Sequence, residues 1–502
     1  MHIAILVIYF FALTCILLFS LFQLQLAYYY LQGRRKRNTH PGKPEMPAQY
    51  PFVTIQLPIY NERYVVERLL EKISGINYPK DKFEIQILDD STDETSDIIR
   101  NKIEELADKR LNISYINRPD RLGFKAGALR EGLKTSQGEL VAIFDADFLP
   151  DSDFLLNTIP YFSDEGICAV QTRWGHLNKD YSLLTQLQAF ALDVHFTIEQ
   201  GGRDSTGYFI GFNGTSGVWR KTAIIDAGNW EGDTLTEDLD LSYRAQLKGW
   251  KLKYLESVVT PGELPVDLNT IKVQQFRWMK GGVQNFLKNS KKVLKAPIPF
   301  MTKVNGLFHL LNGTVFIFSF LVSMLSYPVM LIQKDHSEFI PLFSAGSVFI
   351  LPTLILLFYY GIAYFTINHS FKSVLLFPVY FWLFLVFILG LSMNNVVAVG
   401  EAFLGIKSSF LRTPKFNIRS KSDSWMKNKY LTEGVNYITV LEIIIALFFL
   451  YCIIASVEMK YFSLLYFHVM LFIGFGAVSF LSLKKFVVCK MKLTRARAHK
   501  RI

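Results

Sequence analysis

Two aspartates, Asp145 and Asp147, stand one residue apart at the end of the apolar segment 141–144. In an extended segment, side chains two positions apart project to the same side, so both carboxylates point to one place. Two carboxylates that lie close together repel each other unless a cation joins them. A small number of oxygen ligands suits Mg²⁺ or Mn²⁺, with water and phosphate oxygens completing the shell. The pair therefore predicts a divalent metal that holds a diphosphate; the alternative is that Asp147 only caps the next helix.

Two further acids, Asp89 and Asp90, end the apolar segment 83–90. A carboxylate at this point can accept hydrogen bonds from a base or a ribose. Residues 91–93 also suit a turn that caps the following helix. One acid is enough to begin such a turn, so we expect both functions here.

Three cations, Arg118, Arg121 and Lys125, surround Gly123 ahead of a segment with helical spacing. A helix N-terminus beside cationic side chains is a favourable place for a phosphate. Ordinary surface charge is the alternative for each of them.

The segment 234–250 opens with Thr236, Glu237 and Asp238 and then takes on helical spacing. An acid here can act as a general base that removes the proton from an attacking hydroxyl. Thr236 and Glu237 also suit the start of a helix, so a purely structural role is the alternative.

A guanidinium, an indole and two amides come together in Gln274, Gln275, Arg277 and Trp278. Arg277 can pair with a phosphate through two hydrogen bonds. Trp278 offers a flat face to a sugar ring, and the amides can bind its hydroxyls. The alternative is a helix at the membrane surface, where Trp and Arg mark the headgroup level. Both readings can hold at once.

Apolar strands that alternate with amphipathic helices supply the framework for these residues. The predicted strands are 52–60, 83–90, 111–118 and 140–147, and the predicted helices are 61–75, 93–108 and 124–136. This alternation predicts an α/β domain with a parallel sheet and helices on both faces. Such sheets bind ligands at the carboxyl ends of their strands, so we expect the two pairs of acids at one edge. The glycine-rich turn 212–217 would let the backbone approach a ligand.

Six apolar runs indicate a membrane part. Of the 502 residues, 50% are hydrophobic, and the runs approach or exceed the about 20 residues that a spanning helix needs. They lie at 2–31, 304–332, 342–367, 374–391, 437–457 and 461–483. The first lacks the features of a cleaved signal peptide and is interpreted as a retained anchor. Three spans before the basic loop 408–429 would place that loop outside the cytosol, so we expect an interfacial or re-entrant segment among them, with 374–405 as the candidate.

The net charge of +11 is concentrated in basic clusters such as 33–37 and 484–501. Cationic flanks of spanning helices stay in the cytosol, which predicts a cytosolic central domain and C-terminus. Beside such helices, anionic lipid is a nearer partner than nucleic acid, and we expect no nucleic-acid binding. The four cysteines suggest no disulfide framework.

The ordered set DDSTD, DAD, TED and QQFRW, flanked by apolar helices, resembles the processive family 2 glycosyltransferases. These include cellulose, chitin and hyaluronan synthases. The segments 192–200, 211–220 and 247–255 are similar to the plant cellulose-synthase-like A and C proteins, which make mannan or glucomannan and the glucan backbone of xyloglucan. The resemblance implies a Rossmann-like nucleotide-sugar domain of GT-A type, inserted between an N-terminal transmembrane helix and a C-terminal transmembrane bundle. The expected parts are an anchor (1–32), a linker (33–50), the domain (51–300), transmembrane or interfacial helices (301–406), a gating-type loop (407–432), a transmembrane hairpin (433–484) and a basic tail (485–502).

The resemblance also implies roles for the matched residues. The nucleotide sugar would be bound by Asp89, Asp90, Lys125, Asp145, Gln274 and Arg277. Asp145 and Asp147 would hold Mg²⁺ or Mn²⁺, and Asp238 would be the catalytic base. The acceptor would be bound by Glu237, Gln275 and Trp278, and the gating loop would contact phosphate through Thr413 and Lys415. The family's aromatic-x-valine before this threonine is replaced here by Phe410, Leu411 and Arg412.

The implied reaction is one inverting displacement that moves a hexose from UDP-glucose or GDP-mannose to the end of a growing β-glycan. The alternative in the same chemistry is a non-processive transferase with a lipid acceptor. A transporter with a nucleotide-sensing domain would need ionisable residues inside its spans, where Glu401 and Glu442 are among the few candidates. We expect a multi-pass protein, in the plasma membrane if bacterial and in the Golgi if eukaryotic. An accessory export protein and the oligomeric state are left open.

Overall fold

The computed structural model describes residues 1–39, 42, 44–418, 420–425, 428–430 and 436–499, with the backbone alone at 38–39 and 485–499. Parts of the predicted linker 33–50 and loop 407–432, and the last residues of the predicted tail 485–502, lie outside these ranges.

A seven-stranded sheet forms the centre of the nucleotide-sugar domain, in the order β3-β2-β1-β4-β6-β5-β7. The strands are β1 (Val53–Ile59), β2 (Phe83–Asp89), β3 (Ile113–Asn117), β4 (Leu140–Ile143), β5 (Ile167–His176), β6 (Gly217–Arg220) and β7 (Lys251–Gly262). The first four strands correspond to the four predicted ones and pair in parallel. β6 runs antiparallel to both β4 and β5, so the prediction of a parallel sheet is wrong at this strand, whereas β5 and β7 pair in parallel. Four residues directly after a glycine-rich turn are too few to show a strand period in the sequence.

Helices cover both faces of the sheet and bury it on each side. β2 and β4 are buried at every residue, which explains why they read as continuous apolar runs. One core lies under α2 (Val66–Ser74) and α3 (Thr95–Glu105). The other lies under α4 (Phe124–Thr135) and α9 (Glu237–Leu247). The two cores hold the strand ends, and the acids that follow them, in a fixed arrangement.

The remaining helices of the domain are α5 (Phe154–Thr158), α6 (Leu183–Val194), α7 (Gln200–Thr206), α8 (Lys221–Asp226) and α10 (Leu268–Lys295). Among them, α6, α7 and α10 pack against the apolar part of the chain, whereas α5 and α8 pack against the sheet. Asp267 caps α10 by accepting hydrogen bonds from the backbone N–H groups of Asn269 and Thr270. α10 carries the QQFRW residues and packs along α16 (Ser392–Phe403).

Six helices in the described part of the chain are long and apolar enough to cross a membrane. They are His2–Arg37, Asn312–Asp335, Ser337–Ile367, Phe371–Gly390, Tyr437–Glu458 and Leu465–Lys484. The corresponding elements are α1 (His2–Thr39), α12 (Val315–Asp335), α13 (Ile340–Ala345) with α14 (Leu351–Ile367), α15 (Phe371–Gly390), α17 (Tyr437–Glu458) and α18 (Leu465–His499). The predicted run 304–332 is divided, because α11 (Phe300–Leu310) is a separate helix from α12. α16 is likewise separate from α15, and its position relative to a membrane stays a prediction.

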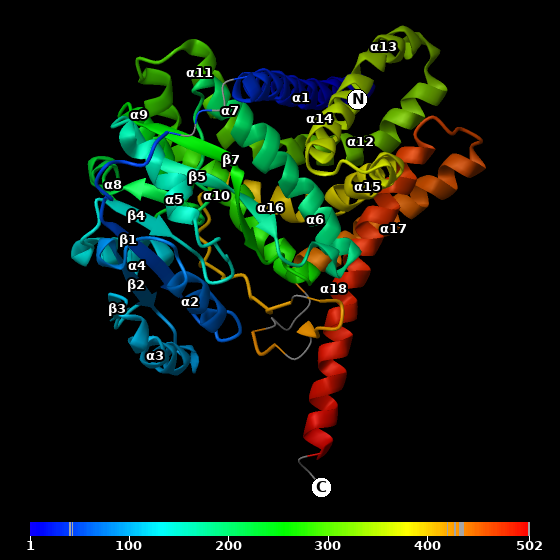
Figure 1. Cartoon of the computed structure of the whole chain (residues 1–502). Helices are drawn as coiled ribbons and strands as arrows, with labels where there is room; N and C mark the ends of the chain where they lie inside the picture. The colour runs from blue at the N-terminus through cyan, green and yellow to red at the C-terminus, as the bar shows by residue number, and fades with distance from the viewer. Residues whose placement is uncertain (40–41, 43, 419, 426–427, 431–435, 500–502) are drawn as a thin grey trace.

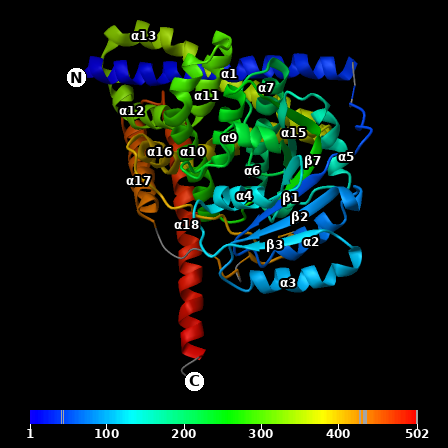
Figure 2. The same cartoon turned by 90° about the vertical axis from the view of Figure 1, so that its left-hand side faces the viewer.

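The sheet domain lies beside the apolar helices (Figure 1). Figure 2 shows α1 crossing one end of the molecule, whereas α18 points away from that end. The segment that follows α16 returns to the domain, where Asn417 accepts a hydrogen bond from Arg68 of α2 at 2.7 Å. This segment therefore lies against the domain and not among the apolar helices.

Candidate active site

One pocket lies at the carboxyl ends of β1, β2 and β4 and is closed by residues from α9, α10 and the segment after α16. Most of the residues singled out in the sequence line it: Asp90, Lys125, Asp145, Asp147, Glu237, Asp238, Gln274, Arg277, Trp278, Thr413 and Lys415. They come from segments that are up to 325 residues apart in the chain, as Asp90 and Lys415 show. The fold thus gathers dispersed acids, cations and an indole around one volume.

Asp145 and Asp147 each face an ammonium group. Lys125 of α4 donates to Oδ1 of Asp145, and Lys415 donates to Oδ2 of Asp147 at 2.7 Å. Burial alone would lower the pKa of Lys125, but the carboxylates of Asp145 and its neighbours raise it, so this side chain is cationic. Asp147 is 1% exposed, and its Oδ1 is buried with no hydrogen-bond partner among the described residues. A buried carboxylate oxygen without a partner, in a pocket that Asp145 also lines, fits a divalent cation.

Asp238 lies at the first turn of α9, where its Oδ1 accepts the Leu239 N–H at 2.8 Å. Burial, reinforced by the Glu237 carboxylate, raises the pKa of Asp238 to about 7, while Lys125 opposes the shift. A carboxyl group with a pKa near neutrality is suited to accept a proton during a reaction. These two features favour Asp238 as a general base, and this role stays a prediction.

Gly214 of the turn 212–217 lies directly against Asp238. Its φ is +81°, and a Cβ at this position would lie 2.8 Å from Oδ2 of Asp238. The carbonyl oxygen of Gly214 accepts a hydrogen bond from Lys125 at 3.0 Å. The neighbour of this turn in the structure is the carboxylate of Asp238, and the predicted approach of its backbone to a ligand stays a prediction.

We expect Gly214→Ala to lower turnover by about tenfold or more, because the added Cβ would displace the carboxylate of Asp238. A small displacement of a catalytic group raises the activation free energy by about 1 kcal/mol or more. The left-handed backbone adds about 1–2 kcal/mol of strain for a residue with a Cβ. The matched control is Gly207→Ala, because Gly207 has φ +68° but open space around the added Cβ. Equal activity losses in both variants would show that strain, and not contact with Asp238, is responsible.

The QQFRW residues are divided between the pocket and its surroundings. Gln274, Arg277 and Trp278 line the pocket, and the guanidinium of Arg277 lies 4.9 Å from the ring centre of Phe410. Gln275 does not line it, so the predicted acceptor contact of Gln275 has no support in this geometry. Successive residues of a helix point in different directions, which the sequence pattern alone did not resolve.

The two acids after β2 also differ. Asp90 lines the pocket and pairs with Arg118, whose Nε donates to Oδ1 at 2.7 Å. Asp89 is fully buried and does not line the pocket; its carboxylate accepts hydrogen bonds from Ser91, Ser96 and Tyr115. Asp89 therefore fixes the turn and does not reach the pocket, and the nucleotide contact of Asp90 stays a prediction.

Comparison with known proteins identifies the family. The family model described as "Glycosyltransferase like family 2" matches residues 51–281. A probable glucomannan 4-beta-mannosyltransferase 2 of Oryza sativa subsp. japonica is 33% identical over 452 residues, which cover 86% of this chain and 75% of that protein. The chain belongs to glycosyltransferase family 2. The predicted resemblance and the predicted GT-A fold class are thereby confirmed.

Other relatives carry similar names over shorter matches. Glucomannan 4-beta-mannosyltransferase 1 of Oryza sativa subsp. japonica is 44% identical over 253 residues, 49% of this chain and 49% of that protein. Glucomannan 4-beta-mannosyltransferase 9 of Arabidopsis thaliana is 44% identical over 252 residues, 49% of this chain and 47% of that protein. The matched part of this family 2 chain thus spans about half the length of each of these relatives.

A solved structure shares the fold of this family 2 chain. It is the mannosyltransferase PcManGT from Pyrobaculum calidifontis, in complex with GDP-Man and Mn2+. The TM-score is 0.52 at 19% identity, and the match covers 81% of this chain and 99% of that one.

Several pocket residues of this family 2 chain were not predicted from the sequence. They are Glu62, His176, Asn213, Glu263 and Arg412. Glu62 follows β1 in the segment PIYNE, at the same strand edge as the predicted acids, so its position was a usable signal. Glu263 follows β7, a strand that the sequence did not reveal.

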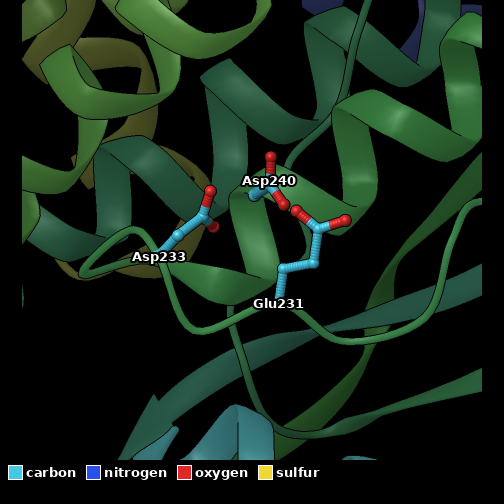
Figure 3. Close-up of side chains that lie close together, drawn as sticks. All are labelled: Glu231, Asp233 and Asp240. Carbon is cyan, nitrogen blue, oxygen red and sulfur yellow. The ribbon is translucent and has the colours of Figure 1, made fainter.

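A second group of acids, Glu231, Asp233 and Asp240, lies outside the pocket, with carboxylates turned towards one another (Figure 3). Lys288 of α10 occupies the space between them, with Nζ 2.6, 2.7 and 3.0 Å from their oxygens. Asp240 also pairs with Arg244 and accepts a hydrogen bond from Asn289. The cation of this cluster is a lysine that ties α9 to α10, and we assign no metal to it.

We expect Lys288→Met to reduce the stability of the protein by about 1–3 kcal/mol, because the fully buried Asp240 loses a charged partner. Thermal unfolding in detergent measures the effect, with the exposed Lys291→Met on the same helix as control. An unchanged melting temperature would mean that Arg244 and Asn289 satisfy Asp240 by themselves.

Proposed function

We propose that the protein transfers a hexose from a nucleotide sugar to the end of a β-glycan, with inversion at the anomeric carbon. The observation that carries this proposal is the meeting of Asp90, Asp145, Asp147 and Asp238 in one pocket. The family 2 assignment supports it, and the names of the relatives point to mannose and a 4-β linkage. GDP-mannose is therefore the first donor to test, ahead of UDP-glucose.

The chain's own residues supply most of the mechanism. Asp238 accepts the proton of the acceptor hydroxyl, whose oxygen then attacks the anomeric carbon in line. Lys125 and Arg277 line the same pocket and would stabilise the negative charge that develops on the departing diphosphate. Asp145 and Asp147 would hold Mg²⁺ or Mn²⁺, which supplies electrostatic stabilisation of that leaving group. One displacement suffices, so the reaction requires no nucleophilic side chain.

Trp278 is proposed as the platform for the terminal sugar of the acceptor, because it lines the pocket beside Gln274 and Arg277. Asp90 is proposed to bind the nucleoside, and Thr413 with Lys415 to bind phosphate from the gating-type loop 407–432. We further propose that the domain 51–300 and this loop face the cytosol, where sugar nucleotides are available, and that the six apolar helices anchor the protein in the bilayer.

A donor screen on purified membranes tests the proposal. We expect GDP release from GDP-mannose in the presence of Mn²⁺ or Mg²⁺, and a product that an endo-β-1,4-mannanase degrades. Membranes carrying Asp238→Asn are the control. A product that partitions into organic solvent would instead favour the lipid acceptor, and no release from any sugar nucleotide would contradict the proposed function.

A further inference from the structure

The segment after α16 inserts basic side chains and backbone N–H groups into an acidic part of the pocket. Arg412 forms two hydrogen bonds with Glu62, at 2.9 and 2.6 Å. Lys415 binds Asp147 at 2.7 Å, and the backbone N–H groups of residues 416 and 417 bind Glu263 at 2.8 and 3.0 Å. All three carboxylates line the pocket and are at most 8% exposed. The loop therefore binds the same three carboxylates that a cationic ligand in the pocket would bind.

The charges around the proposed metal ligands balance without any ligand. Asp145 and Asp147 carry two negative charges, and Lys125 and Lys415 bring one ammonium to each. The ammonium group of Lys415 contacts only one carboxylate oxygen of Asp147. The other oxygen, Oδ1, is buried and has no partner among the described residues. A divalent cation shared by both carboxylates would replace both ammonium charges and could use the open oxygen.

We propose that Lys415 is the resident cation of Asp147 in the nucleotide-free protein, and that it gives up this carboxylate when a divalent metal and a sugar nucleotide bind. The freed ammonium then pairs with the diphosphate, so no charge in the pocket is left without a partner. Lys415 and the metal thus compete for one carboxylate, and metal loading is coupled to the position of the loop. This inference rests on the proposed function, since it assumes that Asp147 is a metal ligand.

Titration of the purified full chain in detergent with Mn²⁺ tests the exchange. The EPR signal of free Mn²⁺ measures how much of the metal is bound. Without nucleotide, we expect Lys415→Met to bind Mn²⁺ about tenfold more tightly than the unmodified protein, because one competing charge in a partly buried site is gone. Lys415→Gln serves the same purpose if the Met variant does not purify as a folded protein. Added GDP should reduce the difference in Mn²⁺ affinity between Lys415→Met and the unmodified protein, because GDP gives Lys415 of the unmodified protein another partner.

Two control variants sharpen the result. Lys415→Arg keeps the charge and should keep the weak Mn²⁺ affinity, and Lys421→Met removes an exposed lysine of the same loop and should change nothing. Equal Mn²⁺ affinity in Lys415→Met and the unmodified protein would overturn the exchange. If Asp147→Asn also left Mn²⁺ binding intact in the presence of GDP, the metal assignment in the proposed function would fail instead.

Discussion

Asp238→Asn is expected to lower turnover by about 10²–10⁴-fold, the range that a positioned general base contributes, while donor affinity stays unchanged. Asparagine has nearly the same shape as aspartate and still accepts the Leu239 N–H that holds the residue at the start of α9. It cannot take the proton of the acceptor hydroxyl. Nucleotide release measures turnover, and calorimetric titration with GDP and Mn²⁺ measures the donor site. A parallel loss of GDP binding would place Asp238 among the donor ligands.

The pH dependence provides a second test of the same residue. Burial and the Glu237 carboxylate raise the pKa of Asp238 to about 7, so the carboxyl group is protonated below this value and is a base only above it. We therefore expect kcat/KM to rise with pH through about 7 and then level off. The residual activity of Asp238→Asn should lack this step. A rate that falls over the same interval would indicate that the group acts in its protonated form.

The sequence was sufficient to predict the part of the site that depends on strand ends. Parallel strands place the residues that follow them at one edge, so Asp90 and the pair Asp145 and Asp147 were predictable from the alternation of strands and helices. The same logic extends to Glu62 after β1, but a single acid in a turn has no pattern of its own that would distinguish it in the sequence. Local periodicity thus predicts which residues lie at the carboxyl edge of the sheet. It does not predict which of their side chains line the pocket.

What the sequence did not reveal depends on contacts between distant segments. β6 is four residues long and joins the sheet antiparallel between β4 and β5, which places the turn with Gly214 next to Asp238. Burial separates Asp89 from Asp90, although the two are adjacent and chemically identical. The pairing of Arg412 with Glu62 joins residues 350 positions apart. Strand pairing, burial and long-range ion pairs of this kind depend on tertiary packing, and they produce no periodic pattern in the sequence.

Asp147→Ala is expected to abolish turnover, by about a thousandfold or more, and in contrast to Asp238→Asn it should also weaken metal-dependent binding of the donor. Asp147 is almost fully buried in the segment that follows β4. The variant therefore removes the partner of Lys415 and a carboxylate oxygen that has no hydrogen-bond partner in the described part of the chain. The expected signature is loss of the Mn²⁺-dependent part of GDP affinity, measured by titration with and without Mn²⁺.

The matched control for Asp147→Ala is Asp233→Ala, which removes an exposed acid from the cluster that Lys288 fills. If Mn²⁺ binds in the pocket, this variant keeps the Mn²⁺ dependence of GDP binding. The opposite outcome, with Asp233→Ala losing it and Asp147→Ala keeping it, would move the metal to the cluster of Figure 3. That result would also require Lys288 to give up three ion pairs, whereas metal binding in the pocket breaks two, Lys125 with Asp145 and Lys415 with Asp147. The smaller number of ion pairs lost, together with the Oδ1 of Asp147 that has no hydrogen-bond partner among the described residues, is why we propose Asp145 and Asp147 as the metal ligands.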